Sequence, residues 1–225
     1  LFAGPTIAFA AGDRVILDQV QSRDYKPYPP LFAAEYAQKI QELLELYPWE
    51  IQLTQLNLLA SHDTARLMSI AGGDIPSIEL CTLLLMTFPG APSIYYGDEV
   101  GLLGALDPDS RRGFPLEAAW NNEILNTHRQ LITLRHKYPC LRTGDYKVLY
   151  AQGEVYIFTR TLDNEQLVIA VNAGTSDSKT NLDVSSLHSL PNNVLYGGAE
   201  LEWNNESETK QVTLHLPARS GCILM

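Results

Sequence analysis

Cysteine is scarce in this sequence, with three residues among 225, at Cys81, Cys140 and Cys222. They are far apart along the chain, they are odd in number, and each stands beside an apolar residue. This usage argues against a disulfide-stapled small domain and against the paired-cysteine spacing of zinc sites. We therefore expect three buried free thiols and no metal site.

Basic residues are outnumbered, because 16 Lys and Arg against 26 Asp and Glu give a net charge of −10. The isoelectric point is near 4.9. A surface that binds nucleic acid needs a basic patch, so this balance argues against nucleic acid as a partner. An uncharged ligand such as a sugar fits the composition, and so does any acidic globular protein.

Long apolar runs are also missing. The longest, residues 80–88, falls far short of the roughly 20 apolar residues that span a bilayer, so no membrane partner is expected. The chain starts at Leu1 within an apolar phrase, without an initiator methionine and without the charge pattern of a signal peptide. We expect the natural N-terminus to lie elsewhere.

Two short apolar runs each end in polar residues, and this pattern indicates a functional site. The run from Leu56 ends abruptly at His62 and Asp63, and a turn into a helix follows. Such a run is typical of a buried strand whose last residues emerge at a site. The second of these segments, residues 90–101, reads Gly-Ala-Pro-Ser-Ile-Tyr-Tyr-Gly-Asp-Glu-Val-Gly. In barrels of parallel strands, catalytic groups sit at the carboxyl ends of the strands.

Helical and strand patterns alternate before residue 142. Breaker residues predict an irregular segment over 1–28 and a long loop over 97–115. The periodicities predict helices over 29–47, 64–71, 76–88 and 120–138, and strands within 51–60 and 93–96. Alternation of this kind indicates a parallel sheet, which belongs either to a small α/β domain or to part of a barrel of about 250 residues.

The pattern changes near residue 142 to short runs of strand length separated by turn signals. The runs are 146–150, 155–161, 167–171, 211–216 and 222–225. The turn signals include Gln152-Gly153 and Asn204-Asn205. Residues 175–189 are mostly polar and predict a loop. The sequence thus predicts a second domain, a small antiparallel β-sandwich over 142–225.

Three phrases in order resemble the α-amylase family of glycoside hydrolases, most closely its neopullulanase and cyclomaltodextrinase branch. They are residues 61–64 (Ser-His-Asp-Thr), 92–99 (Pro-Ser-Ile-Tyr-Tyr-Gly-Asp-Glu) and 107–112 (Asp-Pro-Asp-Ser-Arg-Arg). The resemblance implies an α/β fold, in which residues 1–141 form the C-terminal part of a (β/α)8 TIM barrel, about strands six to eight. Residues 1–4, 55–63 and 92–98 resemble the three strands. An all-β antiparallel sandwich follows.

The same resemblance implies retaining hydrolysis of α-glucosidic bonds in maltooligosaccharides, cyclomaltodextrins or pullulan. Asp63 matches the carboxylate that stabilises the transition state, and His62 matches a neighbour that donates to the same sugar hydroxyls. Asp107 and Arg111 match an Asp-x-x-x-Arg pair that grips the non-reducing sugar. No cofactor is implied, and calcium stays an open question.

The family's nucleophile and general acid lie on strands four and five, and no segment of this chain resembles those motifs. We therefore expect a fragment that is inactive alone and that needs the N-terminal half of the barrel as its partner. The predicted helix over 76–88 is apolar nearly all round, so we expect its packing partners to be absent from this chain. The reduced cysteines and the resemblance together favour a cytoplasmic location.

Other interpretations stay open. An α-glucan transglycosylase shares the fold and differs in the fate of the glycosyl-enzyme, and a non-catalytic relative would keep the barrel as a glucan-binding or interaction module. His62 could be a structural histidine, and Asp63 could cap a helix that begins at Thr64. The acidic pair Asp98 and Glu99 could be catalytic, although the resemblance favours structural roles. Asp107 and Arg111 could form an ordinary loop ion pair.

Overall fold

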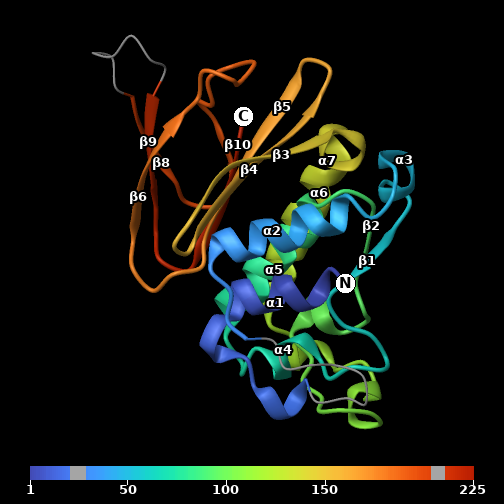
Figure 1. The fold of residues 1–225 in the computed structure, drawn as a ribbon. Helices are drawn as coiled ribbons and strands as arrows, with labels where there is room; N and C mark the ends of the chain where they lie inside the picture. Colours follow the sequence, from blue (N-terminus) through green and yellow to red (C-terminus); the bar gives the residue numbers. More distant parts are fainter. Residues whose placement is uncertain (21–28, 204–210) are drawn as a thin grey trace.

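The computed structural model describes residues 1–20, 29–203 and 211–225. A helical part carries a small parallel sheet, and a β-sandwich packs against it (Figure 1). The α-helices are α1 (Ala3–Ala11), α2 (Ala33–Leu44), α3 (Trp49–Gln52), α4 (Leu67–Ile70), α5 (Ile75–Thr87), α6 (Asn122–Lys137) and α7 (Cys140–Thr143). The strands are β1 (Leu56–Leu58), β2 (Ala91–Ser93), β3 (Asp145–Gln152), β4 (Val155–Leu162), β5 (Glu165–Asn172), β6 (Ser178–Asp183), β7 (Val194–Tyr196), β8 (Glu200–Trp203), β9 (Gln211–Leu216) and β10 (Ser220–Leu224). Among the described helices, none is both long and apolar enough to cross a membrane.

The parallel sheet consists of β1 and β2, and it positions the candidate site. Leu56 lies opposite Ala91, and Leu58 lies opposite Ser93. The buried Asn57 side chain donates through Nδ2 to the Pro89 carbonyl at 2.8 Å, which ties the entry of β2 to β1. β2 begins two residues before the predicted strand at 93–96. Because the two strands are parallel, their carboxyl ends meet at one edge of the sheet.

A third barrel strand at residues 1–4 is wrong, because the chain is already helical from Ala3. The predicted irregular segment 1–28 is therefore also wrong over α1, while its residues 21–28 lie outside the described part. Alanine-rich sequence favours a helix, and Pro5 falls in the first turn, where a missing N–H costs no helical hydrogen bond. The apolar phrase at the start of the chain is thus a buried helix.

The sandwich has two antiparallel sheets, one of five strands ordered β3-β4-β5-β10-β7 and one of three ordered β6-β9-β8. The predicted antiparallel sandwich is confirmed. β6 occupies part of the segment predicted as a loop over 175–189. Thr180 and Leu182 point inward while Lys179, Asn181 and Asp183 are exposed, so the polar outward face concealed the strand. The predicted turn at Asn204-Asn205 lies outside the described residues.

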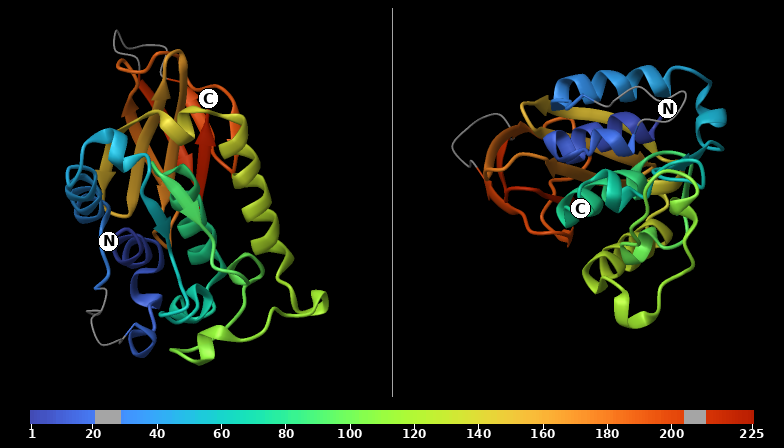
Figure 2. Two further views of the ribbon diagram at one scale, coloured as in Figure 1. Left: turned by 90° about the vertical axis from the view of Figure 1, so that its right-hand side faces the viewer. Right: turned by 90° about the horizontal axis from the view of Figure 1, so that it is seen from below.

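Helix α5 is the centre of the molecule. It packs against α6 on one side, against α1 on another, and against β10 of the sandwich, and it is buried along its length (Figure 2). A Cβ built on Gly221 of β10 would lie 2.4 Å from Leu83 Cδ2, so the sheet approaches the helix closely. The expectation that this helix lacks partners within the chain is wrong, because the sandwich and two helices cover its apolar faces.

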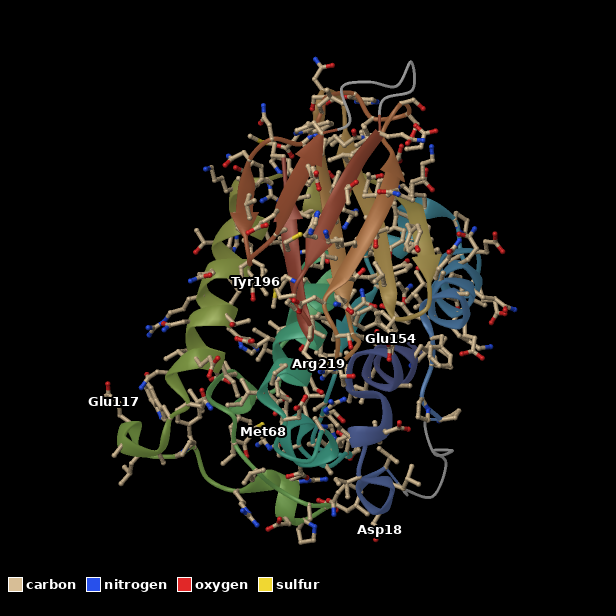
Figure 3. The ribbon with its side chains drawn as sticks, turned by 90° about the vertical axis from the view of Figure 1, so that its left-hand side faces the viewer. Asp18, Met68, Glu117, Glu154, Tyr196 and Arg219 are labelled. Carbon is tan, nitrogen blue, oxygen red and sulfur yellow. The ribbon has the colours of Figure 1, made fainter. Side chains whose placement is uncertain are left out.

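The N-terminus of α5 is capped by an aspartate that also binds the sandwich. Asp74 Oδ2 accepts from the Ser77 backbone N–H at 3.0 Å and from Arg219 Nη2 at 2.7 Å. Arg219 also donates to the carbonyls of Ala10 and Ala173, each at 2.7 Å, at the junction of helices and strands (Figure 3). Burial alone would raise the pKa of Asp74, but bonds from Ser77 and Arg219 outweigh it and hold that pKa below its usual value.

The C-terminus of α5 is capped by two buried arginines with carbonyl partners. Arg135 of α6 donates through Nη1 to the Met86 carbonyl at 2.7 Å and the Phe88 carbonyl at 3.0 Å. Arg160 of β4 donates to the Thr87 carbonyl and, at 2.9 Å, to that of Gly144. Burial lowers the pKa of Arg160 to about 9 and that of Arg135 to about 10. The sandwich therefore holds α5 at both ends.

Candidate active site

Among the residues that the structure describes, no backbone N–H donates to the Asp63 carboxylate in the turn after β1. The Ser61 N–H donates to Thr64 Oγ1 at 2.9 Å, and the Asp63 N–H donates to Ser61 Oγ at 3.2 Å, which closes a tight local turn. Helix α4 begins only at Leu67, with Arg66 at its N-cap. The alternative that Asp63 caps a helix starting at Thr64 is therefore wrong. The side chain is 67% exposed.

All four side chains predicted for the site lie together. Arg111 Nε is 2.7 Å from Asp107 Oδ1 and donates to the His62 carbonyl at 3.1 Å. Arg111 Nη2 is 3.5 Å from Asp63 Oδ1, and His62 Nε2 is 3.2 Å from the same oxygen. Arg111 is thus the common partner that joins the loop after β2 to the edge of β1.

The cluster is open to solvent, with side-chain exposures between 47% for Arg111 and 67% for Asp63. Exposed ion pairs contribute only about 0–1 kcal/mol each to folding, so stability alone does not account for four interlinked groups here. The group offers carboxylate acceptors, imidazole and guanidinium donors within one small area. Such a set matches the hydroxyls of a sugar, which both donate and accept hydrogen bonds.

A buried arginine under this cluster was not predicted from the sequence. Arg66 is 0% exposed, and its guanidinium lies 4.0 Å from the centre of the Tyr95 ring and 4.4 Å from that of Tyr96. Nε donates to the Ser110 carbonyl at 2.7 Å, and Nη1 donates to the Tyr96 carbonyl. One signal was present, because the arginine three residues after Asp63 is the single charged residue of the mostly apolar stretch 64–71.

Asp98 and Glu99 bind groups within the protein and lie apart from the exposed cluster. Asp98 is 7% exposed, with Oδ1 3.4 Å from Arg66 Nη1. Glu99 accepts the Gly97 N–H at 2.7 Å. Neither carboxyl shares the exposed surface of the cluster, so the geometry does not support a catalytic acid pair. Burial raises the pKa of Asp98 to about 7, because the charge of Arg66 only partly offsets the loss of solvation.

We predict that Asp98 makes the protein less stable as the pH rises from about 4 to about 7. A carboxyl whose folded-state pKa exceeds its unfolded value binds extra protons when folded, so its stabilising contribution is present below about pH 4 and lost by about pH 7. Nuclear magnetic resonance should show the Asp98 carboxyl carbon titrating near pH 7. Asp98→Asn should flatten the decline in unfolding free energy between about pH 4 and 7. A midpoint near pH 4 would contradict this.

The three cysteines are free and buried, as predicted. Burial raises the pKa of Cys81 and of Cys222 to about 12, and it raises that of Cys140 further. These thiols are therefore protonated and unreactive at neutral pH. Within residues 1–20, 29–203 and 211–225, no group of three or more His, Cys, Asp and Glu side chains is arranged to hold a metal ion.

Comparison with known proteins identifies two family profiles in the chain. "Alpha amylase, catalytic domain" matches residues 16–114, and "Alpha-amylase C-terminal domain" matches residues 144–224. A cyclomaltodextrinase from Geobacillus thermopakistaniensis is 35% identical over 185 residues, which cover 81% of this chain and 31% of that protein. Neopullulanase 2 from Thermoactinomyces vulgaris is 38% identical over 130 residues, covering 56% of this chain and 22% of that protein.

A solved structure, the debranching enzyme from Nostoc punctiforme, superposes with a TM-score of 0.94 at 77% identity. The match covers 99% of this chain and 46% of that one. The chain thus spans about a third of the cyclomaltodextrinase and under half of the debranching enzyme. These similarities confirm the predicted fold class, a TIM-barrel portion followed by an antiparallel β domain.

Proposed function

Because the chain belongs to the α-amylase family of glycoside hydrolases, we propose that it supplies part of the active site of a retaining α-glucan hydrolase. That part consists of the transition-state carboxylate, Asp63, and of a sugar-binding arm, the pair Asp107 and Arg111. The observation that carries the proposal is the exposed cluster in which Arg111 joins Asp107, Asp63 and the backbone of His62. The substrates are maltooligosaccharides, cyclomaltodextrins or pullulan. Support comes from relatives named cyclomaltodextrinase and neopullulanase.

Asp63 acts on the sugar ring that acquires positive charge in the transition state. In a retaining mechanism, a nucleophilic carboxylate forms a glycosyl-enzyme, a second carboxyl group protonates the leaving oxygen, and water then releases the sugar. Asp63 accepts hydrogen bonds from hydroxyls of the distorted ring. Those bonds strengthen as the ring becomes cationic, because the negative carboxylate then faces developing positive charge. Interactions that strengthen only in the transition state raise the rate.

His62 and Arg111 fix the Asp63 carboxylate before substrate arrives. Both approach Oδ1, at 3.2 Å and 3.5 Å. Among the described residues, no hydrogen bond engages the other oxygen, Oδ2, which leaves it for a sugar hydroxyl. The second ring nitrogen of His62 is a further donor or acceptor for the same sugar. Asp107 and the remaining N–H groups of Arg111 bind the hydroxyls of the sugar at the non-reducing end.

The nucleophile and the general acid come from barrel strands outside these 225 residues. The free edges of the small sheet support this part of the proposal, since β1 and β2 are each paired on one side only among the described residues. A hollow of about 330 Å³ lies beside β1, and one of about 540 Å³ lies beside β2. Leu56 is 64% exposed at this surface. A closed barrel leaves no such edges, so further strands complete the sheet there.

The proposal predicts retention of the α-configuration in the first product. The polypeptide encoded by the complete reading frame that contains these residues should cleave maltooligosaccharides, and proton spectra taken within the first turnovers should show the α-anomer before mutarotation. Longer oligosaccharides formed alongside would indicate transglycosylation on the same glycosyl-enzyme. An initial β-anomer, or no cleavage of any of the three substrate classes, would refute the retaining hydrolase.

A further inference from the structure

Arg66 touches three separate segments of the chain that together carry the site. Its backbone N–H donates to the Gly104 carbonyl at 3.0 Å, and its Nε donates to the Ser110 carbonyl at 2.7 Å. Its Nη1 donates to the Tyr96 carbonyl at the exit of β2. Arg66 itself follows Asp63 by three residues. The guanidinium therefore connects the turn after β1, the exit of β2 and the loop that holds Asp107 and Arg111.

The loop between residues 104 and 112 depends on this arginine for its position. Ser110 is fully buried beneath the cluster, and its Oγ donates to the His62 carbonyl at 3.4 Å. Its backbone carbonyl is the acceptor of Arg66 Nε. A Cβ on Gly104 would lie 2.7 Å from the Asp109 carbonyl oxygen and 3.1 Å from Arg66 Cγ, so loop and arginine pack without spare room. The neighbouring Arg111 is thereby held on the Asp63 side.

We propose that Arg66 is the positioning residue that holds the Asp107–Arg111 arm against Asp63. Arg66 does not bind the side chains of Asp107 and Arg111. It binds the backbone carbonyl of Ser110, which lies between them. That Asp107 and Arg111 bind sugar rests on the proposed glucan-hydrolase function. That Arg66 anchors their loop does not. Lysine cannot replace the arginine here, because one ammonium group cannot reach two carbonyls that a planar fork reaches in fixed directions.

Limited trypsin digestion measures the anchoring without any activity. Arg111 and Arg112 form an exposed tryptic site within the anchored loop. Cleavage there should be about tenfold or more faster in Arg66→Lys than in the unchanged protein, because local opening becomes easier. Mass spectrometry identifies the fragments that end at 111 or 112. Equal cleavage rates in the two proteins would overturn the proposal.

Arg135→Lys is the matched control for this digestion. Arg135 is also a buried arginine that donates to backbone carbonyls, but its acceptors lie at the far end of α5, at Met86, Phe88, Leu141 and Gly90. At a temperature below both melting transitions, this variant should leave cleavage at 111 and 112 near the rate of the unchanged protein. An equal acceleration in both variants would mean general loosening, and it would overturn a specific role of Arg66.

Steady-state kinetics on the polypeptide of the complete reading frame separates positioning from simple loss of folded protein. Arg66→Lys should raise KM for maltooligosaccharides about tenfold, because the displaced arm no longer binds the sugar. A variant that merely unfolds in part would lower kcat in proportion and leave KM unchanged, and that result would overturn the proposal. If the unchanged protein cleaves no glucan, the hydrolase function fails, and the trypsin ratio still decides whether Arg66 holds the loop.

A second variant covers the case in which Arg66→Lys does not fold. Gly104→Ala leaves Arg66 in place and pushes the loop away from it, because the added methyl group meets the Asp109 carbonyl and Arg66 Cγ. The glycine φ lies outside the left-handed region, so the backbone itself tolerates alanine. This variant should show the same faster cleavage at 111 and 112 and the same rise in KM. A Gly104→Ala protein that matches the unchanged one in both measurements would overturn the proposal.

Discussion

Asp63→Asn is expected to lower kcat on maltooligosaccharides about a thousandfold in the polypeptide of the complete reading frame. Contacts to the distorted sugar are worth several kcal/mol in such enzymes, and each 1.36 kcal/mol is a factor of about ten in rate. Asparagine keeps the size of the side chain and removes the charge that meets the cationic ring. KM should change by only about a few-fold, because the ground-state sugar is neutral. Steady-state kinetics with maltotriose or longer substrates measures both constants.

The melting transition of Asp63→Asn should match that of the unchanged protein, since the side chain is 67% exposed and its ion pairs are weak. Asp13→Asn is the matched control, because Asp13 is an exposed aspartate in a short 3-10 turn after α1. It should keep full activity. A loss of less than about tenfold in Asp63→Asn would contradict the assignment of Asp63 as the transition-state carboxylate.

Arg160→Met is expected to lower the free energy of unfolding by about 3 kcal/mol. Methionine approximates the apolar stem but leaves the buried carbonyls of Thr87 and Gly144 without their donor. Each stranded carbonyl costs about 1–3 kcal/mol. Part of the loss is offset, because the guanidinium is buried beside Arg135, and burial with that neighbouring charge lowers its pKa to about 9. Urea unfolding with an unchanged m-value measures the difference.

Arg142→Met is the control for this substitution. Arg142 donates to the carbonyls of Arg135 and His136 at the end of α6, and it is exposed. Water can replace its hydrogen bonds, so the loss should be about 1 kcal/mol or less. If Arg160→Met costs no more than this control, then the carbonyls of Thr87 and Gly144 have found other donors, and the contact of Arg160 with the end of α5 is not important for stability.

Much of this fold follows from local sequence patterns, and the failures have physical causes. The four helices α2, α4, α5 and α6 and five strands of the sandwich were predicted near their observed positions, because periodicity reports burial on one face, whereas the short helices α3 and α7 were not predicted. β6 was missed because three of its side chains, Lys179, Asn181 and Asp183, face solvent and give it a polar composition. α1 was missed because Gly4 and Pro5 look like breakers, although proline is tolerated in a first helical turn.

The exposed residues of the site could be predicted from the sequence, whereas the buried arginine that positions them could not. His62, Asp63, Asp107 and Arg111 stand in recognisable phrases, and the structure brings them together. Arg66 binds backbone carbonyl oxygens of residues that lie 30 and 44 positions further along the chain. Because every residue has a carbonyl, the types of these residues do not identify them as partners of Arg66. The same holds for Arg135 and Arg160, which pair with backbone instead of with acidic residues.

The contacts of the sandwich with both ends of α5 limit which C-terminal domains could replace this one. A C-terminal domain transplanted from another family member has to bring an arginine equivalent to Arg160, another equivalent to Arg219, and a glycine where Gly221 lets Leu83 approach. In chimaeras joined near residue 142 that lack these residues, α5 would keep Asp74 and Arg135 at its ends but lose the hydrogen bonds from Arg219 and Arg160. Substitutions at these three sandwich positions are therefore expected to destabilise the central helix of the other domain.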